Sequence, residues 1–259
     1  MAQAVFFDID GTLVSFTTHT VPPSALDALA ALKRQGVKVF IATGRSLKQM
    51  DNLHDLTFDG YITMNGAYCV NDRYEIIHKS VIPQTDIEAL IRYQEEQEQF
   101  PVEIMTTEEQ TISYINEKVT ALIELVNLPM PGVKSLREAS RNEILQMGIF
   151  VDKEQERDIM RHVLVHCHAT RWYPIFADIN LRGCSKQSGI DHLLKYYNIR
   201  LDETLCFGDG GNDISMLRHA AIGVAMGNAP DEVKRTANYV TDTVDNDGIW
   251  KALKHFKVI

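Results

Sequence analysis

A short apolar run that ends in closely spaced carboxylates constrains the fold more than any other feature. Residues 5–7 are Val-Phe-Phe, and they lead directly into Asp8 and Asp10, which Gly11 follows. A short, wholly apolar run is typical of a strand buried on both faces of a parallel sheet. We therefore expect residues 5–7 to form such a strand, with carboxylates at its C-terminal end.

The next segments repeat the alternation of helix and strand. A helical pattern begins at Pro22-Pro23, places Leu26, Leu29 and Leu32 on one face, and stops at Gly36, a residue suited to a helix C-terminus. Residues 37–42 are rich in β-forming residues, and a further helical stretch is expected after the Thr-Gly-Arg that follows them. This order predicts a parallel sheet.

The middle of the chain interrupts that order. Turn pairs within residues 61–79 predict a small antiparallel ribbon, and from residue 83 the pattern changes until it resumes after residue 181. The expected fold class is α/β. A Rossmann-like, doubly wound parallel-sheet core would comprise residues 1–82 and 182–259, and residues 83–181 would be an inserted α+β domain.

Composition excludes several classes of function. The chain has 259 residues, a net charge of −9 and a pI near 5.5, and no cluster of basic residues, which argues against a nucleic-acid partner. Its four cysteines are widely spaced, as expected of reduced thiols, and no apolar run is long enough to cross a bilayer. We expect a cytoplasmic protein without a membrane partner. A monomer is compatible with the sequence, which leaves the oligomeric state open.

Asp8 and Asp10 are the first candidate chemical groups. Residues two apart on a strand share a face, so both carboxylates can meet in one place. Such a pair can ligate Mg²⁺, or divide into a nucleophile and a proton donor. A solvated turn with a helix-capping acid is the alternative.

Three more segments carry polar groups suited to phosphate or metal. Residues 208–213, Gly-Asp-Gly-Gly-Asn-Asp, follow a strand and open a helix, where backbone N–H groups favour an anion. Asp213 stands where a dinucleotide-binding fingerprint requires glycine, which argues against that cofactor. Thr43 offers a hydroxyl at a strand end, and Lys186 offers a cation near a helix start. Taken separately, Thr43 and Lys186 are each more often a cap or a surface charge, whereas capping alone is the lesser interpretation of residues 208–213.

Taken together, these motifs resemble those of the haloacid dehalogenase superfamily of phosphohydrolases. The resemblance is to its type IIB, or Cof-like, branch, and it rests on Asp-Ile-Asp-Gly-Thr at 8–12, Ala-Thr-Gly-Arg at 42–45, Ser-Lys at 185–186, residues 208–213 and Gly-Val-Ala-Met-Gly-Asn-Ala at 223–229. It implies that residues 83–181 are a type IIB cap domain, which closes over the core and contributes specificity.

The resemblance also implies roles for individual residues. Asp8 would be the nucleophile and Asp10 the general acid and base. The implied Mg²⁺ ligands are Asp8, Asp10 through its main-chain carbonyl, Asp209 and Asp213. The implied substrate-binding residues are Thr43, Gly44, Arg45, Lys186 and Asn212. Asn65 and Asp178 are further candidate substrate contacts.

The function implied is Mg²⁺-dependent hydrolysis of a small phosphate ester, with sugar phosphates as the leading substrate class. A phosphomutase would use the same nucleophile, and a sensor could bind the ester without hydrolysing it. A signalling receiver also combines an Asp phosphoacceptor with a Thr and a Lys, but Asp10, two residues after the nucleophile, favours turnover. These alternatives stay open at this point.

A second metal site is a weaker hypothesis. His162 and His166 lie four apart on a helix expected over residues 152–165, and Cys167 and His168 follow. This spacing can bind a transition metal, but no fourth ligand is evident. Packing at the helix end is the preferred interpretation.

Overall fold

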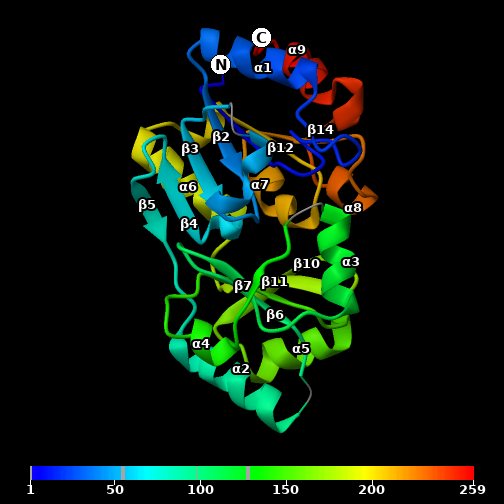
Figure 1. The fold of residues 1–259 in the computed structure, drawn as a ribbon. Coiled ribbons are helices and arrows are strands. Elements are labelled where there is room, and N and C mark those ends of the chain that lie inside the picture. Colours follow the sequence, from blue (N-terminus) through cyan, green and yellow to red (C-terminus); the bar gives the residue numbers. More distant parts are fainter. Residues whose placement is uncertain (1, 54–55, 98, 127–128) are drawn as a thin grey trace. The chain divides into compact units, whose positions relative to one another are not determined.

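The chain divides into two compact units in the computed structural model (Figure 1). The core unit comprises Met1–His78 and Ser185–Ile259, and the cap unit comprises Lys79–Cys184. The structure describes residues 2–53, 56–97, 99–126 and 129–259.

An eight-stranded sheet forms the centre of the core unit, in the order β14-β13-β12-β1-β2-β3-β4-β5. The strands from β14 to β3 are parallel, and β4 runs antiparallel to β3. The strand bounds are β1 Ala4–Phe7, β2 Lys38–Ala42, β3 Gly60–Thr63, β4 Tyr68–Asn71, β5 Ile76–Lys79, β12 Thr204–Gly208, β13 Ile222–Ala225 and β14 Tyr239–Val240.

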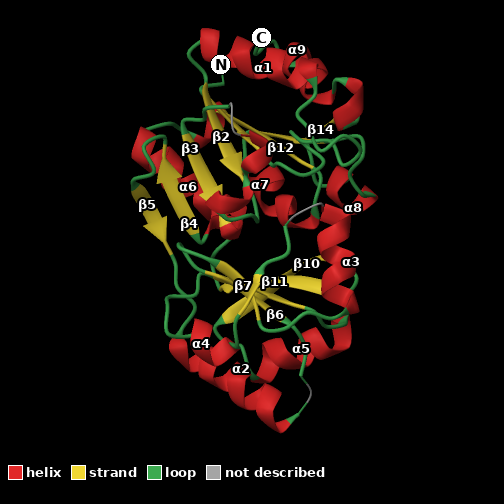
Figure 2. Ribbon diagram, in the orientation of Figure 1, coloured by secondary structure: helices red, strands yellow, loops and turns green. Residues whose placement is uncertain are grey.

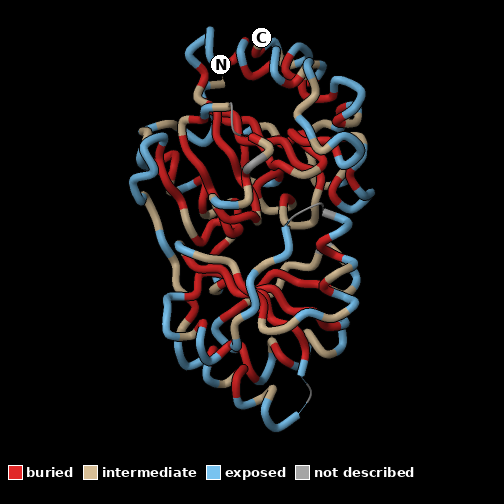
Figure 3. Tube along the Cα trace, viewed as in Figure 1, coloured by how far each residue is buried: buried red, intermediate tan, exposed pale blue. Residues whose placement is uncertain are grey.

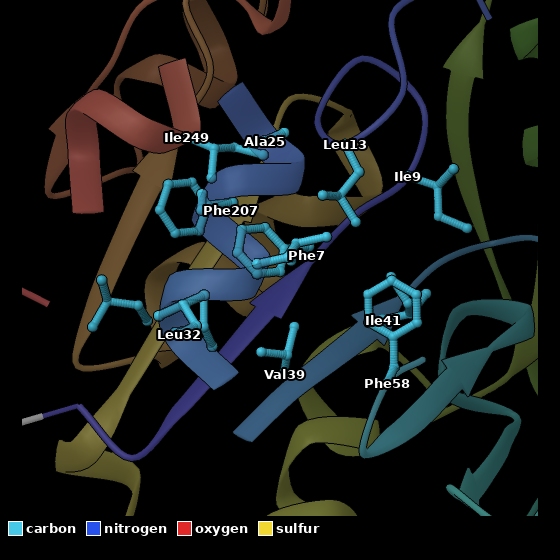
Figure 4. Close-up of a cluster of buried hydrophobic side chains, with 14 of the residues drawn as sticks. Phe7, Ile9, Leu13, Ala25, Leu32, Val39, Ile41, Phe58, Phe207 and Ile249 are labelled. Atoms are coloured by element: carbon cyan, nitrogen blue, oxygen red, sulfur yellow. The ribbon is translucent and has the colours of Figure 1, made fainter. Parts of the chain in front are cut away.

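Helices pack on both faces of this sheet. Figure 2 shows the helices in red and the strands in yellow. Val5 and Phe7 of β1 point to one face and pack with α1 and α9, whereas Ala4 and Phe6 point to the other and pack with α6, α7 and α8. Figure 4 shows Phe7 and Phe207 in the first of these clusters. The helix bounds are α1 Pro23–Arg34, α6 Lys186–Tyr197, α7 Ile214–His219, α8 Asp231–Lys234 and α9 Gly248–His255.

Two local expectations in the core unit need correction. Leu26 is exposed, because the buried face of α1 is formed by Ala25, Ala28, Leu29, Ala31 and Leu32. The helical stretch expected after Arg45 is two short 3₁₀ turns, Leu47–Gln49 and Asp51–Leu53. The expected antiparallel pairing is present between β3 and β4, and β3 also pairs with β2, so that the ribbon extends the main sheet.

The cap unit is built on a six-stranded mixed sheet in the order β10-β11-β9-β6-β7-β8. Its strands are antiparallel except for the β7–β8 pair. The strand bounds are β6 Val102–Met105, β7 Gln110–Ile112, β8 Gly132–Val133, β9 Gln146–Ile149, β10 Cys167–Tyr173 and β11 Phe176–Leu181. The helix bounds are α2 Gln84–Glu96, α3 Glu117–Val126, α4 Leu136–Ala139 and α5 Lys153–His162.

The two faces of the cap sheet are packed differently. One face, with Val102 and Ile104 of β6, packs against α2, α4 and α5. On the other face Ile112 packs with α3, while Glu103 of β6 is also buried. Figure 3 shows that the strands of both sheets are largely buried. Each unit therefore has a hydrophobic core of its own.

The helix expected over residues 152–165 is shorter than predicted. It ends at His162, and Cys167 and His168 belong to β10, so helix-end packing was the wrong interpretation of those two residues. The His166 ring instead contacts the buried Asp86 carboxylate, with Nδ1 2.7 Å from Oδ1. All four cysteines are buried and none forms a disulfide. Within the described residues, every helix is too short or too polar to cross a bilayer.

Candidate active site

Adjacent parallel strands deliver the site residues to one edge of the core sheet. β1 lies between β12 and β2, and the Asp8 N–H continues the ladder by donating to the Phe207 carbonyl at 3.0 Å. Asp8 follows β1, Thr43 follows β2 and Asp209 follows β12. Since parallel strands end at the same edge, three motifs that are distant in the sequence become neighbours there.

Three carboxylates form a buried group at this edge. Oxygen atoms of Asp8, Asp209 and Asp213 lie within 4.8 Å of one another, and no other such group of acids, histidines or cysteines occurs in the described part of the chain. The carboxylate of Asp10 is not part of it. The structure thus brings together three of the four predicted metal-site residues through their side chains. For Asp10, the group predicted to bind the metal is the main-chain carbonyl and not the carboxylate.

Lys186 links two of these carboxylates. Its Nζ donates to Asp8 Oδ1 and to Asp213 Oδ1, at 2.6 Å in both cases, and the side chain is wholly buried. The residue is the first of α6, whose N-terminus is capped by Ser185 accepting from the Ser188 N–H. A buried ammonium needs such paired charges, because an isolated one would be strongly disfavoured.

The burial and crowding of these charges shift their pKa values. Burial, reinforced by the charge of Asp213 and opposed by that of Lys186, raises the pKa of Asp8 to about 7. Burial and the charges of Asp8 and Asp213 raise the pKa of Asp209 to about 8. Burial would lower the pKa of Lys186, but the charges of Asp213 and Asp8 outweigh it and raise the pKa above its usual value. The lysine therefore stays charged.

Two residues that orient Asp209 were not singled out from the sequence. The Thr12 hydroxyl donates to Asp209 Oδ1 at 3.0 Å, and the Asn228 amide donates to Asp209 Oδ2 at 3.1 Å and to the Gly11 carbonyl at 2.8 Å. Both lie inside quoted motifs, at 8–12 and 223–229. Their hydrogen bonds to Asp209, which is distant in the sequence, become visible only in the folded structure.

Asp213 organises the loop that carries Asp209. Its Oδ2 accepts from the N–H groups of Asp209 and Gly210, at 2.9 and 2.8 Å, while its Oδ1 accepts from Lys186. The side chain is fully buried. Asp213 therefore connects the phosphate-binding lysine of the sequence prediction to the second acidic loop.

The predicted substrate-binding residues Gly44 and Asn212 lie together. The Asn212 amide donates to Asn65 Oδ1 at 3.0 Å, and a Cβ on Gly44 would lie 3.3 Å from the Asn65 side chain. Asn65 is buried and has a φ of 52°, an uncommon backbone conformation outside glycine. Thr43, which precedes Gly44, is also buried, and its carbonyl accepts from the Asn65 N–H at 3.0 Å.

Two predicted substrate contacts, Arg45 and Asp178, have carboxylate or amide partners within their own units. Arg45 forms an ion pair with the Asp10 carboxylate. Asp178 belongs to β11 of the cap unit, where it accepts from Gln146 Nε2 at 3.3 Å.

The donor set of this edge suits a hard divalent cation. Magnesium prefers carboxylate and carbonyl oxygens, and Asp8 and Asp209 provide such oxygens within one buried group. A divalent cation near them would favour their charged forms and so oppose the upward pKa shifts. The residues present therefore fit a magnesium ion.

Comparisons with known proteins identify the family. The family model for haloacid dehalogenase-like hydrolases matches residues 5–253. The putative phosphatase YkrA of Bacillus subtilis is 31% identical over 262 residues, covering 100% of this chain and 99% of that protein. The subclass IIB sugar phosphatase BT4131 is 46% identical, with a TM-score of 0.93 and complete coverage of both chains.

A second solved phosphatase, BT1666 from Bacteroides thetaiotaomicron, is 40% identical, with a TM-score of 0.93, over 100% of this chain and 96% of that one. The parallel core sheet, the separate mixed sheet and the buried acids conform to the same pattern. The chain belongs to the haloacid dehalogenase superfamily, as a phosphatase of its Cof-like subclass IIB.

Proposed function

We propose that this phosphatase is a Mg²⁺-dependent phosphomonoesterase that hydrolyses small phosphorylated metabolites, with sugar phosphates as the substrate class, through an aspartyl phosphate on Asp8. The observation that carries the proposal is the buried contact of Asp8 with Lys186 beside the Asp209 carboxylate. It supplies a nucleophile, a cation for phosphate oxygens and the ligands for a metal in one place.

Asp8 performs the covalent step. One of its carboxylate oxygens attacks phosphorus while the bond from phosphorus to the ester oxygen breaks, and Asp10 gives a proton to the departing alkoxide. Water then attacks the phosphorus of the aspartyl phosphate, Asp10 takes a proton from that water, and the carboxylate of Asp8 leaves. Inorganic phosphate and the alcohol are the products.

Other residues hold the charged groups. Lys186, with the Thr43 hydroxyl and the backbone at Gly44, would bind the non-bridging phosphate oxygens, and Asn212 would complete the rim. Asp8, Asp209, the Asp10 carbonyl and Asp213 would hold the Mg²⁺, which neutralises phosphoryl charge when bound. Asp213 is also hydrogen-bonded to Lys186 and to the Asp209 loop, so it would position those groups as well.

Sugar phosphates are favoured by the neighbours. BT4131, 46% identical to this chain over its whole length, is described as a sugar phosphatase. Two B. subtilis relatives, YitU and YcsE, 28% and 25% identical, are described as phosphatases of a phosphorylated ribityl compound. Polyhydroxylated leaving groups are common to these proteins.

The nucleophile provides the direct test. We expect the wild-type chain to release inorganic phosphate from hexose and pentose phosphates with Mg²⁺ and to lose this activity in EDTA. Asp8→Asn should lower kcat by roughly 10³-fold or more while leaving the circular dichroism spectrum unchanged. Asp27→Asn, an exposed position on α1, is the matched control and should retain activity.

The same assay separates the alternatives. A phosphomutase would convert one phosphate ester to its isomer and release little phosphate, and a sensor would bind the ester without consuming it. Substantial Mg²⁺-dependent phosphate release by Asp8→Asn would contradict the assignment of the nucleophile.

A further inference from the structure

Most N–H groups of the Arg45 guanidinium contact other residues of the chain. Its Nε donates to Asp10 Oδ2 at 2.8 Å and its Nη2 donates to Asp10 Oδ1, so the guanidinium grips both oxygens of the carboxylate. Its Nη1 donates to the Gln49 carbonyl at 2.7 Å and reaches Asn52 Oδ1 at 3.5 Å. Arg45 is buried, whereas the Asp10 side chain is 32% exposed.

These bonds leave the guanidinium little capacity for another ligand. It has five N–H donors in a fixed plane, and the four contacts to Asp10, Gln49 and Asn52 engage four of them. A substrate phosphate would have to displace the Asp10 carboxylate to obtain a two-pronged contact. The geometry therefore favours a role toward Asp10.

Asp8 and Asp10, the two reacting carboxylates of the proposed mechanism, contact different cationic side chains. Lys186 contacts one oxygen of Asp8, as a point charge does, whereas Arg45 engages both oxygens of Asp10. A bidentate guanidinium fixes the plane of a carboxylate as well as its position. A residue that must give a proton to one oxygen and take one from another benefits from such a fixed plane.

We propose that Arg45 is a positioning residue that fixes the carboxylate of Asp10 for general acid and base catalysis, anchored by the carbonyl of Gln49. The inference rests on the proposed function, and it replaces direct substrate contact as the role of Arg45.

A double-mutant cycle tests it, with a hexose 6-phosphate and p-nitrophenyl phosphate as substrates. Protonation matters far more for the sugar alkoxide than for nitrophenolate, which is a weak base. Arg45→Ala should lower kcat for the sugar phosphate by about 10- to 100-fold, and by a smaller factor for the nitrophenyl ester, with KM changed less than about threefold. Added to Asp10→Ala, it should cost less than about threefold more.

Two further measurements separate positioning from binding and from misfolding. Inhibition by orthovanadate, a phosphate analogue, should be unchanged in Arg45→Ala, and Arg45→Lys, which keeps the charge but loses the fork, should recover part of kcat. Lys38→Ala, which breaks the ion pair with Asp59 in the same unit, is the control for loss of a cation and should retain activity.

Losses that multiply in the double variant, or a KM and vanadate constant that rise together, would overturn the role assigned to Arg45 while the phosphatase function stands. If Arg45→Ala does not fold, the same criteria apply to Arg45→Lys. Lack of phosphate release by the wild-type chain from every ester would overturn the proposed function and this inference with it.

Discussion

At the scale of single residues, the loop that follows β1 has no room for a side chain at position 11. Gly11 has a φ of +78°, and a Cβ there would lie 2.2 Å from Asp209 Oδ2. Gly36 at the end of α1 has a similar φ of +73° but nothing within 4 Å of such a Cβ. Alanine substitutions at these two glycines therefore separate the cost of the backbone conformation from the cost of crowding the acidic group.

Gly11→Ala should therefore impair catalysis, whereas Gly36→Ala should not. Both variants should lose about 1–2 kcal/mol of stability from the left-handed backbone. Gly11→Ala should in addition lose roughly 10²-fold in kcat, because Asp209 must move. Thermal unfolding and phosphate release measure the two effects. Equal activity of the two variants would show that Asp209 does not need its present position.

Residue identity could be predicted for the charged groups of the site but not for all their partners. Asp8, Asp209 and Lys186 stand in motifs whose order can be recognised directly in the sequence. Thr12 and Asn228 contact the site through hydrogen bonds to Asp209, and Thr12 is 197 positions from it. Thr and Asn are common in turns, so their local sequence carries no signal of such distant partners.

At the scale of elements, burial decided which parts could be predicted. β1 and, after its first residue Lys38, β2 are buried on both faces, so their sequences are apolar runs that are easily recognised. β10, with the sequence CHATRWY, is an edge strand of the cap sheet and lacks an apolar run. β11 alternates instead, with Ala177 and Ile179 facing the core of the cap unit and Asp178 between them. α1 was placed correctly, but its buried face depends on alanines as much as on leucines.

β6 of the cap sheet carries a buried acid with a testable pH dependence. Burial, opposed by a hydrogen bond from Gln110, raises the pKa of Glu103 to about 7 from an ordinary value of 4.5. Between these pH values the folded chain keeps a proton that the unfolded chain releases. The contribution of Glu103 to stability is thus present below pH 4.5 and is lost as the pH rises through 7.

Glu103→Gln should remove this loss of stability at rising pH. We expect the variant to match the wild type near pH 4 and to exceed its stability near pH 8 by roughly 1–3 kcal/mol in denaturant unfolding. Glu124→Gln, on the exposed side of α3, should show no such trend. A parallel pH dependence of wild type and Glu103→Gln would mean that Glu103 ionises normally.

At the scale of the whole molecule, the acidic group and the six-stranded mixed sheet belong to separately packed units. All three members of the acidic group lie in the core unit, and the cap unit has its own clusters on α2, α4 and α5 and on α3. A ligand of the acids alone should therefore stabilise one unit more than the other.

Hydrogen exchange with and without Mg²⁺ measures this difference. At about 100 times its dissociation constant, Mg²⁺ should stabilise the core unit by roughly 2.7 kcal/mol and slow exchange in β1 and β12. Exchange in residues 79–184 should change little, and Asp209→Asn should abolish the effect. Equal protection throughout the chain would show that the units unfold together.

The pairing of β1 with β12 has a consequence for biosynthesis. Asp8 is synthesised before Lys186, which follows it by 178 positions, and β12, the strand that pairs with β1, is made later still. Contacts so distant in sequence form late and slowly. A growing polypeptide therefore contains Asp8 before it contains the groups that contact this aspartate in the folded chain. Under the proposed mechanism, catalytic competence would arise only when synthesis has passed Asp213, and turnover would then be a measure of completed folding.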